Sequence, residues 1–273
     1  MRIKFLGTGA SEGIPSLFCN CPVCKNAREV GGRAVRSRSG VLLDDDLLID
    51  FSPDMFLNAQ RYGVDCSKIH NILVSHSHWD HLSIYDIAPQ RYKIEEQDVL
   101  PLHIYSNATV LEQIKGAWRS LCENGFVQLQ QLTMGKTFSV GAYNVTVFRS
   151  QHMKPEESMV YLLEKEGKKY LHLFDTGEGI DQIVFYLQER GIKIDAVSMD
   201  CTYGLLEREY FGHMNLNQCI RLSKRLKKVG VFTPDTKICV THICHWGGTY
   251  ADLQEKASAH GIQVAYDGLE LEI

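Results

Sequence analysis

The sequence has no long apolar run, no excess of basic residues and no secretion signal. No stretch approaches the roughly 18 consecutive apolar residues that span a bilayer, and the start, MRIKFLGTGA, has too short an apolar run for a signal peptide. Its 29 Lys and Arg face 33 Asp and Glu, a net charge of −4, which argues against a protein that coats nucleic acid. We therefore expect a cytoplasmic protein with neither a membrane nor a nucleic acid as its partner.

Linkers and internal repeats are also missing. No Pro/Ser-rich or Gly/Ser-rich segment divides the 273 residues, and β-like runs alternate with helical ones throughout. Single α/β domains routinely reach about 250 residues, so we expect one domain over residues 1–273. The β-like runs suffice for two sheets with helices interleaved, which predicts an α/β (α+β) fold of four layers in the order αββα.

The expected elements follow from periodicity and turn residues. The β-like runs are 3–6, 40–43, 47–51, 71–75, 102–105, 143–148, 159–163, 169–174, 196–199 and 237–241, with two short runs at the C-terminus. The helical runs are 53–62, 108–122, 180–190, 215–227 and 250–260. Three acids, Asp44, Asp45 and Asp46, lie between two β-like runs, and we interpret them as a solvated hairpin turn.

Nine cysteines are an odd number, and three of them form a C-x-C-x-x-C pattern, Cys19, Cys21 and Cys24. This spacing suits thiolates around one ion better than disulfides in a reducing compartment. A closed tetrahedral site needs a fourth ligand, and Cys₃His is a common structural zinc arrangement. His245 is the candidate fourth ligand, Cys244 is its rival, and free thiols in a loop are the other interpretation.

Four candidate ligands lie within six residues directly after the β-like run 71–75. His76 and His78, two apart in extended backbone, point the same way and can share an ion. Asp80 and His81 begin a different turn and can reach a second ion. Because three imidazoles and a carboxylate cost desolvation and charge repulsion unless a cation compensates them, the cluster predicts two adjacent metal sites.

The segment 76–81 reads H-x-H-x-D-H, and in this motif the chain resembles the metallo-β-lactamase fold superfamily. The resemblance implies the four-layer αββα sandwich and two divalent ions. The ligands that it implies are His76, His78 and His152 for one ion, Asp80, His81 and His242 for the other, and Asp175 between the two. It also implies that Asp50 supports the cluster by accepting hydrogen bonds. Zinc, manganese and iron suit these ligands alike.

Two further features narrow the resemblance to the PhnP-like phosphodiesterases of phosphonate degradation, the carbon–phosphorus lyase pathway. The chain opens with Gly7-Thr8-Gly9, and a His, His245, stands three positions past His242 to join the C-x-C-x-x-C cysteines. The resemblance implies one structural zinc and hydrolysis of a small cyclic phosphate diester, such as phosphoribosyl 1,2-cyclic phosphate. Hydroxide shared by the two metals would be the nucleophile.

A departing alkoxide needs a proton, and family similarity points to His213 as the donor, with Asp80 beside the metals as the second catalytic residue. Three arginines, Arg33, Arg36 and Arg38, lie within six residues. Guanidinium groups match phosphate geometry, but a short basic run is also typical of a solvated face, and both interpretations stay open.

Other functions fit parts of the pattern. A tRNA 3′-end endonuclease of the same superfamily shares the metal ligands but predicts a long protruding arm. A lactone or thioester hydrolase is a further candidate because a fold does not fix a function, and a non-catalytic metal-binding protein is another. The sequence does not define the oligomeric state, and a homodimer is one arrangement that it allows.

Overall fold

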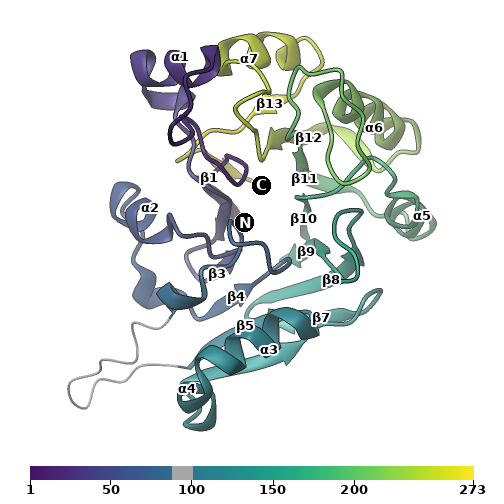
Figure 1. Cartoon of the computed structure of the whole chain (residues 1–273). Helices are drawn as coiled ribbons and strands as arrows, with labels where there is room; N and C mark the ends of the chain where they lie inside the picture. Colours follow the sequence, from purple (N-terminus) through teal and green to yellow (C-terminus); the bar gives the residue numbers. More distant parts are fainter. Residues whose placement is uncertain (88–100) are drawn as a thin grey trace.

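The computed structural model describes residues 1–87 and 101–273, and its centre consists of two seven-stranded sheets (Figure 1). The first sheet contains, in spatial order, β14 (Glu270–Glu272), β1 (Arg2–Gly7), β2 (Gly40–Leu43), β3 (Leu47–Ile49), β4 (Asn71–Leu73), β5 (Leu102–Ser106) and β6 (Val127–Gln131). The second contains β13 (Gln263–Val264), β12 (Phe232–Thr241), β11 (Ile194–Asp200), β10 (Lys168–Leu173), β9 (Met159–Lys165), β8 (Tyr143–Arg149) and β7 (Thr137–Val140).

Helices cover the outer face of each sheet. The α-helices are α1 (Pro22–Val30), α2 (Met55–Arg61), α3 (Ala108–Ala117), α4 (Arg119–Glu123), α5 (Asp181–Glu189), α6 (Leu216–Lys228) and α7 (Tyr250–Ser258), and the 3₁₀ helices are η1 (Gly32–Ala34), η2 (Cys66–Lys68) and η3 (Ile84–Ile87). Apolar residues of α2, α3 and α4 pack on the first sheet, and those of α5, α6 and α7 pack on the second. The predicted order αββα is confirmed.

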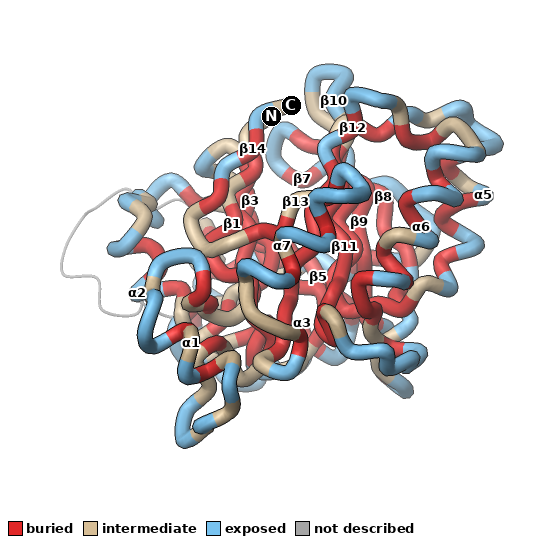
Figure 2. Tube along the Cα trace, turned by 90° about the horizontal axis from the view of Figure 1, so that it is seen from above, coloured by how far each residue is buried: buried red, intermediate tan, exposed pale blue. Residues whose placement is uncertain are grey.

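The strands alternate their side chains between two cores, as period 2 requires. On β1, Ile3 and Phe5 lie in the core between the sheets, whereas Leu6 belongs to the core under α2 and α3. On β2, Val41 and Leu43 point inward and Leu42 outward. Figure 2 shows that these central strands are buried along most of their length.

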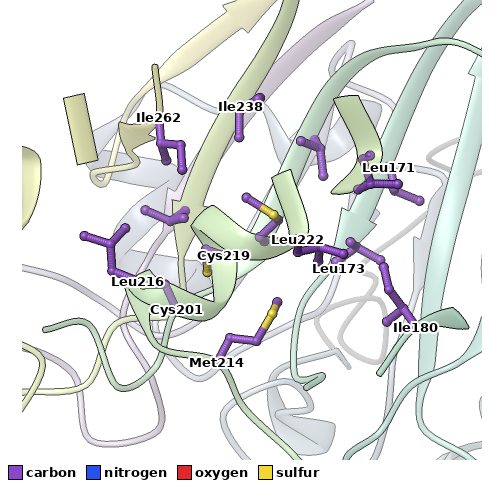
Figure 3. Close-up of a cluster of buried hydrophobic side chains, with 14 of the residues drawn as sticks. Leu171, Leu173, Ile180, Cys201, Met214, Leu216, Cys219, Leu222, Ile238 and Ile262 are labelled. Carbon is purple, nitrogen blue, oxygen red and sulfur yellow. The ribbon is translucent and has the colours of Figure 1, made fainter. Parts of the chain in front are cut away.

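Helix α6 contributes Leu216, Cys219, Leu222 and Leu226 to the outer core of the second sheet. Its residues Cys219 and Leu222 lie in one buried cluster with Leu171 and Leu173 of β10 (Figure 3). The Asn215 side chain accepts the Gln218 N–H and the Gln218 side chain accepts the Asn215 N–H, a reciprocal cap at the start of this helix. The same turn follows His213 in the chain, so the packed helix holds that histidine's loop in place.

Several elements differ from the sequence-based expectation. The helical run 108–122 is broken at Trp118, whose φ of −123° and ψ of 36° are not helical. Helix α1 and strands β6 and β7 were not predicted. The solvated-turn interpretation was wrong for Asp44, which accepts the Arg2 N–H at 2.6 Å and pairs with the Lys165 ammonium at 2.8 Å. Within residues 1–87 and 101–273, no helix has the length and apolar character to cross a membrane.

Candidate metal centre

Five strands of the two sheets bring polar residues to one place. In each sheet the strands concerned run parallel, β3 with β4 and β10 with β11 and β12, so their carboxyl ends lie on the same edge, where α/β proteins place their ligands. The residues at or just beyond these ends are Asp50 after β3, His76 to His81 after β4, Asp175 after β10, Asp200 on β11 and His242 after β12.

Three of these residues have left-handed backbone. The φ angles are 62° for Asp50, 46° for Asp175 and 58° for His242. Asp and His are among the few non-glycine residues that tolerate this region, and such conformations concentrate at functional sites because surrounding structure enforces them. The sharp turn ends each strand and places the polar side chain at the edge of the sheet.

The first donor cluster contains His76, His78, His152 and Asp175, whose ligand atoms all lie within 4.8 Å of one another. The His78 Nδ1 is 2.9 Å from the His76 Nε2 and 3.0 Å from the His152 Nε2. The Asp175 Oδ2 is 3.3 Å from the His76 Nε2. Three imidazole nitrogens and one carboxylate oxygen thus converge on one point, and they belong to the four residues that the resemblance implied for one ion and for the bridge.

The second cluster contains Asp80, His81 and His242. The Asp80 Oδ2 lies 3.4 Å from the His81 Nε2 and 3.5 Å from the His242 Nε2. Asp175 reaches this cluster as well, because its Oδ2 is 3.1 Å from the His81 Nε2 and its Oδ1 is 3.0 Å from the His242 Nε2. The structure therefore places Asp175 between the two clusters, where a bridging ligand would stand.

The electrostatics of the site fit bound cations. The Asp175 Oδ1 is buried and accepts no hydrogen bond among the described residues. Burial alone would raise the pKa of Asp175, but the surrounding histidines hold it well below its usual value. Burial also opposes a charge on His81, yet Asp175, Asp50 and Asp80 raise its pKa well above normal. Buried carboxylates that stay ionised and stabilise positive charge on neighbouring groups also stabilise a bound divalent cation.

Asp50 occupies the supporting position that the resemblance implied. Its Oδ2 lies 2.6 Å from the His81 Nδ1, and its carboxylate accepts the Ser75 N–H at 2.8 Å. Hydrogen bonds of this kind fix the ring and tautomer of a metal-binding histidine. Thr202, which the sequence did not single out, makes the equivalent contact to the His242 Nδ1 at 2.8 Å.

His213 lies beside both clusters. Its ring stacks on His242 with centroids 5.7 Å apart and meets the His152 ring edge-on at 4.7 Å. Its Nδ1 is 2.8 Å from the Asp200 Oδ2. Burial would lower the pKa of His213, but Asp200 raises it to about 9. Sequence reasoning gave Asp200 no role, although its place at the end of a buried strand was a signal.

The cysteine cluster forms with His245 as predicted. The His245 Nδ1 is 3.2, 3.6 and 3.4 Å from the Sγ atoms of Cys19, Cys21 and Cys24, respectively. All four donor atoms lie within 4.8 Å of one another, and three cysteine sulfurs with one imidazole are a donor set that suits a structural zinc ion. Cys244, the rival ligand, does not belong to this group of donors among the described residues.

The three arginines do not converge. The Arg33 guanidinium lies over the Tyr266 ring, 4.3 Å from its centroid. Arg36 is only 3% exposed and donates from Nη1 to the Thr8 Oγ1 and the Ala265 carbonyl. Arg38 forms a two-pronged pair with Asp54. The structure thus brings no pair of them together around one phosphate.

The family described as the beta-lactamase superfamily domain matches residues 46–243. This stretch is most of the chain and includes both donor clusters, so the chain belongs to that family. The resemblance read from the segment 76–81 is thereby confirmed.

Solved structures with the same fold include a diphosphatase from the PhnP family, 23% identical and with a TM-score of 0.78, over 100% of this chain and 97% of that one. Zn²⁺-bound PqqB from Methylobacterium extorquens is 19% identical over the whole of both chains, with a TM-score of 0.75. The short form of human tRNase Z is 17% identical, with a TM-score of 0.63 over 100% of this chain and 99% of that one. At these identities the likeness shows the fold.

Two curated relatives match shorter parts of the chain. An octanoyltransferase of Porphyromonas gingivalis is 34% identical over 90 residues, which are 32% of this chain and 17% of that protein. Coenzyme PQQ synthesis protein B of Methylobacterium radiotolerans is 35% identical over 95 residues, 30% of this chain and 32% of that protein. The chain therefore spans no more than about a third of either relative.

Proposed function

We propose that this protein is a cytoplasmic phosphodiesterase that uses two divalent cations to hydrolyse a small cyclic phosphate diester. The observation that carries the proposal is the position of Asp175 between two donor clusters, with His213 in ring contact with one histidine of each. The resemblance to PhnP-like enzymes makes phosphoribosyl 1,2-cyclic phosphate the first substrate to test.

The proposed chemistry divides between the cations and the chain. When bound, two divalent cations activate water and stabilise charge on the phosphoryl oxygens. His213 holds the proton that the leaving oxygen needs: its Nδ1 contacts the Asp200 carboxylate at 2.8 Å, which leaves Nε2 for proton transfer. The Asp200 carboxylate raises the pKa of His213 against the opposing effect of burial, which favours the protonated ring that a general acid needs.

Substrate preference tests the proposal directly. Purified protein loaded with Mn²⁺ or Zn²⁺ should hydrolyse bis(p-nitrophenyl) phosphate and leave nitrocefin and simple lactones intact. Asp175→Asn is the matched inactive variant, because Asn tolerates the left-handed backbone of position 175 and changes only one carboxylate oxygen. Turnover of lactones or nitrocefin without turnover of phosphate esters would move the assignment to acyl chemistry.

A second candidate is endonuclease cleavage of tRNA, because human tRNase Z shares the fold over the whole chain. An RNA enzyme depends on basic contacts to phosphates, and the net charge here is −4. Precursor tRNA cleaved with a KM that rises steeply with salt would favour this candidate. Cleavage of cyclic phosphates that is insensitive to salt would favour the proposed phosphodiesterase.

A further inference from the structure

An open pocket of about 270 Å³ lies against the segments that lead into His152 and His213. It is lined by Gln151, Glu178, Gly179, Glu209, Tyr210, Phe211 and Gln218. Neither the resemblance nor the sequence pattern assigned these residues a role.

The pocket is joined to the metal centre through the backbone. Gln151 directly precedes the metal-cluster residue His152, whose Nδ1 is 3.3 Å from the Gly212 carbonyl. The Tyr210 ring stacks against His213 with centroids 6.3 Å apart. A substrate whose phosphate lies at the donor clusters would therefore extend its organic part toward this pocket.

Close packing holds the pocket wall in place. A Cβ atom added at Gly179 would lie 2.3 Å from the Gln151 Nε2, and one added at Gly177 would lie 2.0 Å from the Phe211 carbonyl oxygen. The Gly179 N–H donates to the Gln151 Oε1 at 3.2 Å. Because the atom that Gly177 approaches is backbone, only glycine fits there, whereas at Gly179 the Gln151 side chain could move aside.

The polar groups of the pocket can both accept and donate hydrogen bonds. Glu178 and Glu209 supply carboxylate acceptors, although both also bind the guanidinium of Arg221. Gln218 is only 4% exposed, its Oε1 accepts the Asn215 N–H, and its amide NH₂ has no hydrogen-bond partner among the described residues. A hydroxyl group satisfies both kinds of partner, whereas an ammonium group only donates.

The pocket is also unfavourable for a second phosphate. Its two carboxylates and the Arg221 guanidinium leave one net negative charge, and no Lys or Arg belongs to the pocket lining. The arginines at 33, 36 and 38 do not offer an alternative cluster, because they contact three different groups. Tyr210 and Phe211 add aromatic faces, on which a sugar ring packs well.

We propose that this pocket binds the hydroxyl-bearing organic group of the phosphate ester and discriminates against a second phosphate on that group. The inference rests on the proposed phosphodiesterase function and makes its substrate class more specific. It favours a ribose 1,2-cyclic phosphate without a 5-phosphate over the 5-phosphorylated form.

Two substrates that differ only in the 5-phosphate test the inference. We expect kcat/KM to be on the order of tenfold higher for ribose 1,2-cyclic phosphate than for phosphoribosyl 1,2-cyclic phosphate, since like charges at short range change binding by about this amount. The double variant Glu178→Gln/Glu209→Gln should reduce the preference, mainly through KM. The control Glu189→Gln/Glu255→Gln removes the same charge from exposed positions on α5 and α7 and should preserve it.

Equilibrium binding separates this inference from the proposed function. Calorimetry with ribose 1-phosphate and ribose 1,5-bisphosphate should show the same preference for the compound with one phosphate, and the same response to both double variants. If neither cyclic ester is hydrolysed but this binding preference holds, the function fails and the pocket assignment stands. A preference for the bisphosphate, or one that the pocket variant leaves unchanged, would overturn the pocket assignment.

Discussion

At the scale of single residues, the part of the site that is local in sequence could be predicted from the spacing of its residues. His76, His78, Asp80 and His81 lie within six residues, so the motif alone placed them together, and the structure does the same. Asp200 and Thr202 act on His213 and His242 from another strand end. No spacing within the sequence joins these residues, because Thr202 meets His242 only when β11 and β12 pair and Asp200 meets His213 only when the loop before α6 folds back.

The proton-donor role of His213 predicts an effect that depends on the leaving group. His213→Ala should slow esters with poor alkoxide leaving groups by about 10²- to 10⁴-fold, the usual contribution of a general acid. Activated p-nitrophenyl esters should lose far less, because their leaving group departs without a proton. Steady-state kinetics over a series of esters with different leaving groups measures this effect. An equal loss of rate for all esters would show that His213 is not the proton donor.

Asp80 belongs to the second donor cluster and predicts a loss of metal without a loss of fold. Asp80→Ala should abolish turnover and lower the catalytic metal content, because it removes a carboxylate 3.4 Å from the His81 Nε2. Elemental analysis and circular dichroism of the purified variant measure both effects. Full metal occupancy together with full activity would contradict the assignment of Asp80 as a ligand.

At the scale of elements, helix α1 is tied to the cysteine cluster. Cys21 precedes this helix and its side chain accepts the Cys24 N–H, with Pro22 in the first turn. Proline in the first turn is a sequence signal for the start of a helix, but the segment was interpreted as a metal-binding loop and the helix was not predicted. The broken run 108–122 shows the opposite case, in which helical periodicity continued across a backbone break at Trp118.

Cys21→Ser should lower zinc content and melting temperature before it affects catalysis. The serine keeps a cap for α1 but is a poor zinc ligand, so the loss should come from the metal site. Thermal unfolding, zinc analysis and kcat, measured on the same preparation, separate an effect on the zinc site from an effect on catalysis. Cys66→Ser, at an exposed cysteine outside the cluster, is the control and should leave all three unchanged.

The hairpin between β2 and β3 predicts an acid-dependent contribution to stability. Burial would raise the pKa of Asp44, but the Arg2 N–H, Lys165 and Tyr143 together lower it. A lowered pKa means that the ionised Asp44 stabilises the fold above its unfolded pKa of about 3.9 and that this contribution is lost as the pH falls further. Asp44→Asn tolerates the same left-handed backbone.

Urea unfolding from pH 7 to pH 3 measures this contribution. Asp44→Asn should be less stable than the parent at pH 7, and the difference should shrink as the pH falls below about 4. The neighbouring variant Asp45→Asn, whose carboxylate is half exposed, serves as the control. A stability difference that stayed constant with pH would contradict the ionic origin of the Asp44 contribution.

At the scale of the whole molecule, the two-sheet architecture followed from the alternation of β-like and helical runs, whereas the division of the interior into three buried clusters was not predicted. The side pocket could not be foreseen, because its lining comes from three separate loops and α6. The phosphate interpretation of the arginine run depended on spacing alone, whereas the structure directs Arg33, Arg36 and Arg38 to different partners.

Metal removal should destabilise the whole fold, because the donor clusters join residues of both sheets. Chelation should lower the melting temperature, and Mn²⁺ or Zn²⁺ should restore it. A ligand at 100 times its Kd stabilises by about 2.7 kcal/mol when it binds only the folded state. Differential scanning calorimetry measures the shift, and identical melting curves with chelator and with metal would contradict the bridging role of the site.

The donor set spans the chain from His76 to His242. During synthesis a ribosome would release the first histidines long before β12 is complete, so a growing polypeptide exposes unpaired imidazoles without the groups that complete the cage. Loading of the centre therefore has to wait until β12 and His242 have left the exit tunnel.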